Sequence, residues 1–155
     1  MSAGSTQTGA TTPLTQADVQ ALADVWYKKL DVHAPTEELL PLLADDELEM
    51  RFPEGTMRGH AGFTGWYDRV TRIFFDETHT LKQVALEPAS NGHRARVKVV
   101  VNWQARAWDP PAPKSKWLGF DAYQTWEVQR SPDGRPVIVT YIVDELRPMP
   151  GSASL

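Results

Sequence analysis

The sequence predicts an α+β domain, because helical periodicity fills the first half of the chain and strand patterns fill the second. Apolar residues recur at three- and four-residue spacing in the segments that begin near residues 15 and 59. From residue 78 onward, the chain is rich in Val, Ile, Thr and aromatic residues, with turn sequences between the rich segments. Helices segregated from a run of strands are typical of α+β folds. One strongly curved, mainly antiparallel sheet wrapped around a long N-terminal helix would accommodate the aromatic residues.

The length and composition predict one domain over residues 15–148. A chain of 155 residues with 41% apolar residues can bury a single core of ordinary size. Residues 1–14 are small and polar and are expected to form a disordered tail, while residues 149–155 are expected to form a C-terminal tail. The start of the chain has neither a charged segment nor an apolar segment typical of a signal peptide, so the expected location is the cytoplasm.

Several partner classes are disfavoured by composition. The net charge is -4 and no run of five basic residues occurs, which argues against nucleic acid. No apolar run reaches the roughly 20 residues of a membrane span. The chain has no cysteine, and its histidines lack the HxH or HxxxH spacing of metal ligands. No nucleotide-binding glycine motif or nucleophile elbow is present, so no metal and no dissociable cofactor are expected.

The first two helices are predicted from capping and periodicity. Thr15 and Asp18 have the spacing of a capping box, and a single apolar stripe follows, formed by Val19, Leu22, Ala23, Trp26 and Leu30. Pro35 disfavours helix in the residue before it, so the first helix should end between residues 31 and 34. A second, shorter helix is expected over residues 36–44, irregular because of Pro41.

Residues 47–52 alternate polar and apolar side chains, which predicts a half-buried strand. Leu48, Met50 and Phe52 should face inward, and the sequence Pro53-Glu54-Gly55 should turn the chain. A shift of one residue in the register would instead place Arg51 inside.

The third helix is expected to start near Gly59, and four long strands should follow it. The apolar face of this helix is predicted to comprise Phe63, Trp66, Tyr67, Val70, Ile73 and Phe74. The strands are expected over residues 78–87, 94–108, 117–130 and 136–146, joined as an antiparallel meander with turns at 90–92 and 132–134. The Pro-rich segment 109–116, with Trp108 and Trp117 beside it, is expected to be either a lid or a rigid surface connection.

These elements, in this order, resemble the nuclear-transport-factor-2-like superfamily. The resemblance rests on residues 44–46 before the first strand, residues 52–55 at its end, Arg58-Gly59 before the third helix, and residues 142–144 in the last strand. Within the superfamily, the chain is most similar to the SnoaL-like branch of polyketide cyclases, ketosteroid isomerases and dehydratases. The resemblance implies a cystatin-like cone with a pocket between sheet and helices, and a homodimer formed through the outer face of the sheet.

The resemblance also implies candidate catalytic residues. Ketosteroid isomerases keep a general base at the position of Phe52, so this chain departs from their pattern there. Dehydratase-like and dehydrochlorinase-like members pair a histidine at the start of the second strand with an aspartate at the end of the first helix, which match His79 and Asp31. Imidazole titrates near neutral pH and can take a proton from carbon or oxygen. Tyr27 lies one helical turn before Asp31 and would polarise a substrate carbonyl, although the family tyrosine can instead align with Trp26.

Two interpretations of the site stay open. In the first, the protein is a cofactor-independent isomerase, dehydratase or cyclase, with His79 as base, Asp31 as its partner and Tyr27 as hydrogen-bond donor. A small apolar or aromatic ligand would then contact residues Trp26, Met50, Phe52, Trp66, Trp103, Gln124 and Trp126. In the second, the protein is a non-catalytic binding module, His79 and Asp31 are structural or solvated, and many of the aromatic residues belong to the core or to a dimer interface.

Overall fold

The computed structural model describes residues 12–87 and 94–155. Most of the expected N-terminal tail and the expected turn at 90–92 lie outside these residues. Three helical segments and two short strands come first, and helix α4 and four long strands follow. The elements are α2 Gln16–Asp31, α3 Thr36–Leu39, η2 Leu40–Leu42, β1 Glu49–Phe52, β2 Gly55–Arg58, α4 Gly59–Ile73, β3 Phe74–Leu86, β4 Arg94–Ala107, β5 Lys116–Arg130 and β6 Pro136–Pro148.

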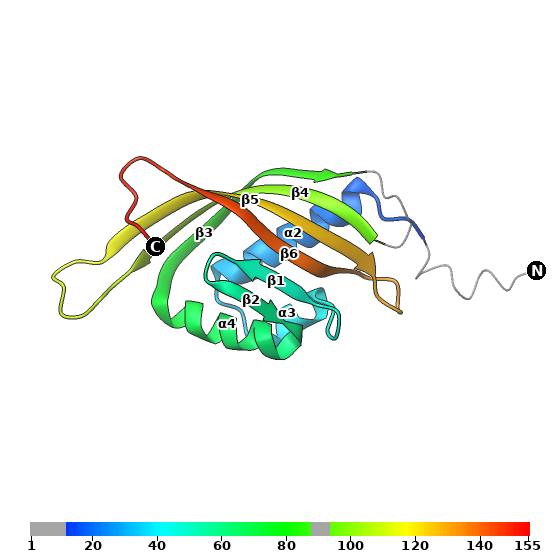
Figure 1. Ribbon diagram of the computed structural model, residues 1–155, viewed down its shortest axis with the longest axis horizontal. Helices are drawn as coiled ribbons and strands as arrows, with labels where there is room; N and C mark the ends of the chain where they lie inside the picture. The colour runs from blue at the N-terminus through cyan, green and yellow to red at the C-terminus, as the bar shows by residue number, and fades with distance from the viewer. Residues whose placement is uncertain (1–11, 88–93) are drawn as a thin grey trace, which may run out of the picture.

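The predicted α+β fold with one curved, mainly antiparallel sheet is confirmed. The six strands are ordered β2-β1-β6-β5-β4-β3, and β3 to β6 form the expected meander. Among the strands that the structure describes, β1 and β6 alone are paired in parallel. Register shifts interrupt β3 against β4 and β5 against β6, and such irregularities bend and twist a sheet. Figure 1 shows the result, with α2 along the inner face of the sheet and α4 with the β1–β2 hairpin at one end.

The structure departs from the predicted elements most clearly at residues 55–58 and at Phe74. Residues 55–58, expected to lead directly into a helix, form strand β2, which pairs with β1 across a tight turn that places Gly55 opposite Phe52. Phe74, expected on the helix, is the first residue of β3. Aromatic residues suit both a helix face and a strand, so periodicity alone did not locate this boundary.

Asp45 and Gly59, two of the residues on which the family resemblance rests, fix the start of α4. Asp45 Oδ1 accepts a hydrogen bond from the backbone N–H of His60 at 3.1 Å, which satisfies a donor that the helix itself cannot pair. Gly59 has a φ of +66°, a value that favours glycine, and its N–H donates to the Leu48 carbonyl at 3.0 Å. These two residues therefore serve to begin helix α4.

The start of α2 carries the predicted capping box. Thr15 Oγ1 accepts from the backbone N–H of Asp18 at 3.1 Å, and Asp18 Oδ2 accepts from the backbone N–H of Thr15 at 2.9 Å. The latter bond is the main cause that lowers the pKa of Asp18, and Arg130 adds to it. The helix that carries Tyr27 and Asp31 is thus fixed at its first turn.

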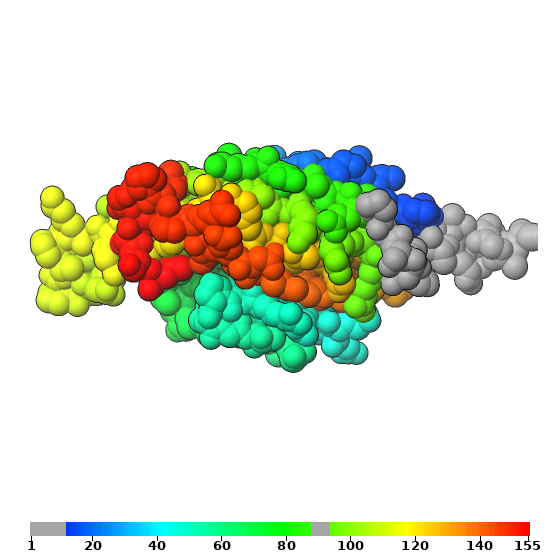
Figure 2. All heavy atoms as spheres, turned by 45° about the horizontal axis from the view of Figure 1, so that its top comes forward, coloured from blue at the N-terminus to red at the C-terminus, as the bar shows by residue number. Residues whose placement is uncertain are grey.

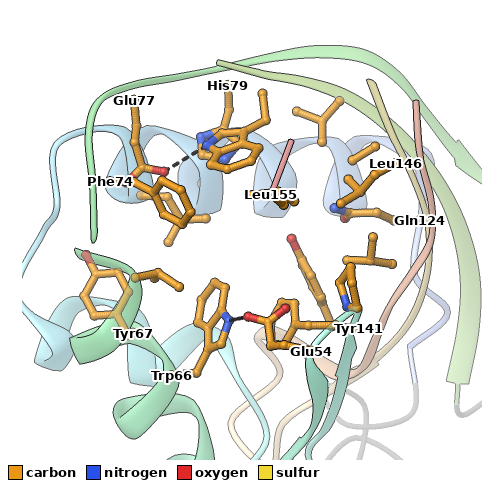
Figure 3. Close-up of a pocket in the computed structure, with 18 of the residues that line it drawn as sticks. Glu54, Trp66, Tyr67, Phe74, Glu77, His79, Gln124, Tyr141, Leu146 and Leu155 are labelled. Carbon is orange, nitrogen blue, oxygen red and sulfur yellow. Dashed lines mark hydrogen bonds between the residues drawn. The ribbon is translucent and has the colours of Figure 1, made fainter. Parts of the chain in front are cut away.

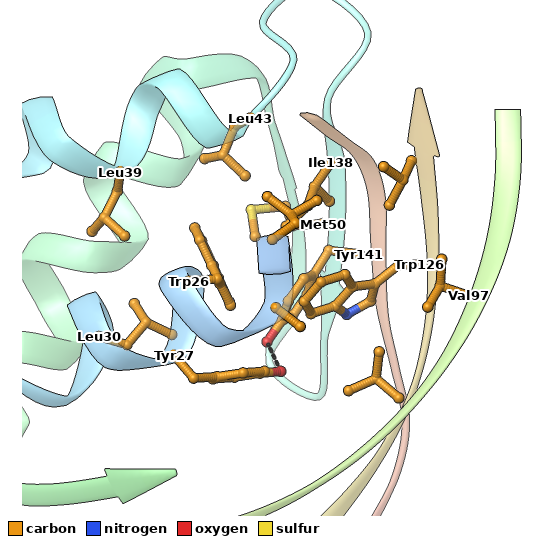
Figure 4. Packing of buried hydrophobic residues seen from close by; sticks show 14 of the residues in the cluster. Trp26, Tyr27, Leu30, Leu39, Leu43, Met50, Val97, Trp126, Ile138 and Tyr141 are labelled. Carbon is orange, nitrogen blue, oxygen red and sulfur yellow. Dashed lines mark hydrogen bonds between the residues drawn. The ribbon is translucent and has the colours of Figure 1, made fainter. Parts of the chain in front are cut away.

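The core lies between α2 and the inner face of the sheet (Figure 4). Trp26 from α2 packs against Tyr141 of β6, with ring centroids 5.8 Å apart, and Tyr141 stacks on Trp126 of β5 at 5.3 Å. Met50 of β1 is fully buried, as the predicted alternation requires, while Arg51 is exposed. The predicted register of this strand is therefore the observed one.

The C-terminal segment lies along β5 rather than apart from the domain. Its Met149 and Ala153 N–H groups donate to the carbonyls of Gly119 and Trp117, both at 2.9 Å. Figure 2 shows this segment in red against the base of the β4–β5 hairpin in yellow, and the tip of that hairpin projects beyond the body.

The outer face of the sheet mixes charges of both signs. Arg96 and Lys98 of β4 lie opposite Glu127 and Thr125 of β5 on this face. The expected homodimer through the outer face stays a prediction. In the residues that the structure describes, no helix is long and apolar enough to cross a membrane.

Candidate active site

A cavity of about 550 Å³ lies between the inner face of the sheet, α2, α4 and the β1–β2 hairpin. Most of its wall is apolar, and the apolar lining includes Leu30, Phe52, Trp66, Val70, Phe74 and Leu146. Figure 3 shows Glu77 and His79 on one side of this cavity, with Gln124 and Tyr141 across from them. A volume of this size accommodates a small ring compound.

His79 and Asp31 meet at the cavity wall. His79 Nδ1 lies 2.6 Å from Asp31 Oδ1, the distance of a strong hydrogen bond. His79 lines the cavity, whereas Asp31, the last residue of α2, lies behind it. Because the carboxylate accepts, we assign the proton of this contact to Nδ1, which leaves the lone pair of a neutral ring on Nε2. The imidazole is thus oriented by a carboxylate and available at the cavity.

Tyr27 packs against His79 and connects it to a second polar group. The two rings are stacked with centroids 4.8 Å apart. The Tyr27 hydroxyl donates to Gln124 Oε1 at 2.8 Å and lies 3.1 Å from the Tyr141 hydroxyl. The hydroxyl proton therefore already has a protein acceptor.

Gln124 is held in one orientation by its neighbours. Its Oε1 also accepts the indole N–H of Trp126 at 2.9 Å. An indole nitrogen can only donate, so the amide oxygen must face Trp126 and the amide nitrogen must face away. Gln124 lines the cavity, and its Nε2 donates to no residue that the structure describes. That nitrogen is a ready donor for an oxygen atom of a ligand.

Burial keeps this hydroxyl cluster protonated. It raises the pKa of Tyr27 well above the ordinary value, and the nearby Tyr141 raises it further. Burial likewise raises the pKa of Tyr141. Neither tyrosine is therefore an acid or base near neutral pH, and both serve as neutral hydrogen-bonding groups.

An aromatic pair forms the wall opposite His79. Phe52 and Trp66 stack with centroids 4.2 Å apart and nearly parallel planes. Trp66 Nε1 donates to Glu54 Oε2 at 3.1 Å, which fixes the indole. The position that holds a base in ketosteroid isomerases thus presents a flat apolar surface, which suits a ring-shaped ligand.

The structure brings together only some of the predicted site residues. Tyr27, Phe52, Trp66, His79, Trp103 and Gln124 line the cavity. In contrast, Trp26, Met50 and Trp126 are fully buried in the core and are not among the lining residues. Their side chains fill the space between α2 and the sheet, so aromatic content alone did not separate core from cavity.

The structure also adds cavity residues that the sequence did not indicate. The most important is Glu77, and Tyr67 joins it. The sequence predicts Tyr67 only as part of a helix face, and Glu77 lies just before the strand expected over residues 78–87. Trp108 and Trp117 do not line the cavity, and Trp108 Nε1 donates to Ala112 O at 2.7 Å within its own hairpin. The hairpin therefore fits a rigid connection better than a lid.

The histidine and carboxylate groups do not form a metal site among the described residues, where no cluster of three or more potential ligands occurs. The histidine and carboxylate groups at the cavity are instead arranged as two pairs, His79 with Asp31 and Glu77 with His33.

Comparison with solved structures gives matches over most of the chain. The hexachlorocyclohexane dehydrochlorinase LinA-type3 from Novosphingobium barchaimii LL02 has a TM-score of 0.71 at 18% identity, covering 90% of this chain and 93% of that chain. ActVI-ORFA from Streptomyces coelicolor has a TM-score of 0.64 at 19% identity, covering 85% and 95%. A protein of unknown function with a cystatin-like fold, from Nostoc punctiforme PCC 73102, has a TM-score of 0.68 at 14% identity, covering 93% and 100%.

Comparison by sequence found no match, either to a family model or to a curated protein. At these identities the structural likeness establishes the fold and not the activity. The chain has a cystatin-like α+β fold, as its sequence predicts.

Proposed function

We propose that this protein is a cofactor-independent acid/base enzyme that isomerises, dehydrates or cyclises a small apolar or aromatic compound. The observation that carries the proposal is the 2.6 Å contact between His79 Nδ1 and Asp31 Oδ1 at the wall of a largely apolar cavity. An imidazole held by a carboxylate is positioned to take a proton, and the carboxylate stabilises the imidazolium that forms.

In the proposed reaction, His79 Nε2 removes a proton from a carbon next to a carbonyl group. The Nε2 amide of Gln124 would donate to the carbonyl oxygen, where negative charge develops. Tyr27 would act through Gln124, because its hydroxyl proton is donated to Gln124 Oε1. The resulting imidazolium returns the proton to another carbon in an isomerisation, or to a leaving hydroxyl in a dehydration.

The named activity of one structural neighbour supports this choice. Dehydrochlorination, for which LinA-type3 is named, also requires removal of a proton from carbon. The alternative, a non-catalytic binding module, is favoured by the stack of Phe52 on Trp66 at the position where a relative keeps its base. Against it stands the burial of His79, whose side chain is 9% exposed and paired with Asp31.

A proton-exchange assay tests the proposal without knowledge of the natural substrate. The probe is 2-tetralone, a flat ketone with acidic C–H groups, and exchange of these protons in D₂O is followed by NMR. The wild-type protein should accelerate exchange over buffer. The variant His79→Ala should reduce this acceleration by roughly a hundredfold or more, the usual contribution of a general base, with an unchanged circular dichroism spectrum.

The matched control is His60→Ala, because His60 lies at the start of α4 and is not among the cavity residues. It should exchange the probe as the wild type does. Exchange at the wild-type rate in His79→Ala would contradict the proposal. Binding of the probe by the wild type without any exchange would favour the binding module.

A further inference from the structure

Glu77 is a cavity residue that the proposed proton transfer does not use. Its side chain is only 10% exposed, and both carboxylate oxygens are engaged. Oε1 accepts the indole N–H of Trp103 at 2.9 Å, and Oε2 is bonded to His33 Nε2. The indole nitrogen can only donate, and we assign the second contact as a donation from His33 to the Glu77 carboxylate. A carboxylate offers about four acceptor positions, so about two are left for a ligand.

The backbone of β3 is irregular where it carries this carboxylate. Phe75 pairs with Arg106 and Thr78 pairs with Gln104, so Asp76 and Glu77 together lie opposite the single residue Ala105. Such a bulge changes which side chains face each side of the strand. Phe74 and Glu77 accordingly both line the cavity, although residues three apart in a regular strand face opposite sides.

Two residues with unfavourable backbone angles hold this arrangement. Asp76 has a φ of +52° and His33 a φ of +50°, values that residues other than glycine rarely adopt. One precedes Glu77 in the chain, and the other supplies its hydrogen-bond donor. Strained backbone is retained mainly at functional sites. The strain beside Glu77 therefore indicates that the orientation of its carboxylate toward the cavity has a function.

We infer that Glu77 is a ligand-binding residue that accepts a hydrogen bond from a hydroxyl group of the ligand. A carboxylate in a largely apolar wall disfavours anionic ligands and favours hydrogen-bond donors. Glu77 and His79 are two residues apart on one strand, roughly 6.5 Å along it. A single ring compound can therefore offer its hydroxyl to Glu77 while a neighbouring C–H group reaches His79 (Figure 3).

The inference rests on the proposed function only in taking this cavity as the binding site, and it names the substrate class as hydroxylated ring compounds. It is tested by binding rather than turnover. The probes are 2-naphthol and 2-methoxynaphthalene, which share a ring system but differ in the O–H donor. Their dissociation constants are measured by equilibrium dialysis at pH 7. The wild type should bind 2-naphthol at least tenfold more tightly, as expected for a hydrogen bond to a charged acceptor.

Two glutamate variants assign this preference to one carboxylate. Glu77→Met removes the acceptor and keeps a side chain of similar length, so the two probes should then bind within threefold of each other. Glu54→Met is the matched control, because Glu54 also lines the cavity and also accepts from the indole of a lining tryptophan. It should keep the tenfold preference. Circular dichroism establishes that each variant is folded.

Several outcomes would overturn the inference. These are equal binding of both probes by the wild type, an unchanged preference in Glu77→Met, or a preference lost in Glu54→Met alone. A preference lost in His79→Ala but kept in Glu77→Met would assign the hydroxyl to His79 instead. If Glu77→Met does not fold, Glu77→Gln replaces it and should lower the preference at least threefold, since a neutral amide oxygen is the weaker acceptor; an unchanged preference there overturns the inference. Failure of the proposed function would appear separately, as undiminished proton exchange in His79→Ala.

Discussion

Two histidine–carboxylate pairs lie at the same cavity wall with opposite orientations. In the first, His79 faces the cavity with a side chain 9% exposed, and Asp31 lies behind it at 27%. In the second, Glu77 faces the cavity at 10%, and His33 lies behind it at 29%. Both pairs join α2 or the loop after it to the start of β3. The same two residue types thus produce two different chemical surfaces.

The comparison indicates that the residue facing the cavity determines what the pair can do to a ligand. The residue behind it fixes the orientation and hydrogen bonding of that facing group. An imidazole in front, with a carboxylate accepting its other N–H, offers a lone pair that can take a proton. A carboxylate in front, held by two N–H donors, keeps acceptor positions free for a hydrogen-bond donor of the ligand. We therefore assign proton transfer to the first pair and ligand recognition to the second.

The largest expected effect comes from breaking the first pair. Asp31→Asn should lower the rate of 2-tetralone proton exchange roughly a hundredfold or more, because the amide neither favours the required tautomer nor stabilises the imidazolium. Asp24→Asn is the control, since Asp24 lies on the same helix and, within the described residues, its side chain accepts a hydrogen bond only from Gln20 Nε2. An exchange rate in Asp31→Asn within threefold of the wild type would show that the carboxylate is structural.

A smaller effect is expected from Tyr27→Phe, which keeps the ring stacked on His79 but removes its hydroxyl. Gln124 Oε1 and the Tyr141 hydroxyl each lose a buried partner, which should cost about 1–2 kcal/mol of unfolding free energy. Urea denaturation measures this loss. The exchange rate should fall less than in Asp31→Asn, because Tyr27 acts on the ligand only through Gln124. A larger fall would mean that the hydroxyl contacts the ligand directly.

Local sequence signals predicted much of the fold. The capping box at Thr15 and Asp18, the alternation that buries Met50, and the turn at residues 132–134 are short-range features that the structure contains. The strand β2 was missed because residues 55–58 follow a turn and are too few to show a period.

The candidate site was only partly predictable. The contact of Asp31 with His79 spans 48 positions in sequence, so no local pattern reports it, and the family resemblance supplied it. Glu77 was not predicted as a cavity residue, because its orientation depends on a β-bulge and on a positive φ at Asp76. The pattern of polar and apolar residues encodes neither feature. Conversely, Trp126 was expected at the ligand, but its indole serves to orient Gln124 from within the core.

The smallest expected effect concerns the charge of the second pair. Burial, together with the charges of Glu77 and Glu38, raises the pKa of Tyr67 from 10.0 to about 12. The hydroxyl donates to the Ala34 carbonyl at 2.7 Å, in the same loop as His33. Because the folded pKa lies above that of the unfolded chain, the stabilisation is complete below about pH 10 and is lost as pH rises toward 12.

Urea denaturation between pH 9 and 12 should therefore show a falling free energy of unfolding, and Tyr67→Phe should make that fall shallower while lowering stability at pH 7. Glu77→Gln should shift the absorbance-detected titration of Tyr67 toward lower pH, because it removes one of the charges that oppose ionisation. Glu54→Gln is the control and should leave the titration unchanged, since Glu54 is not among the causes of the shift. The same titration in Glu77→Gln and wild type would mean that His33 already neutralises the carboxylate, and that the second pair presents no net charge to the cavity.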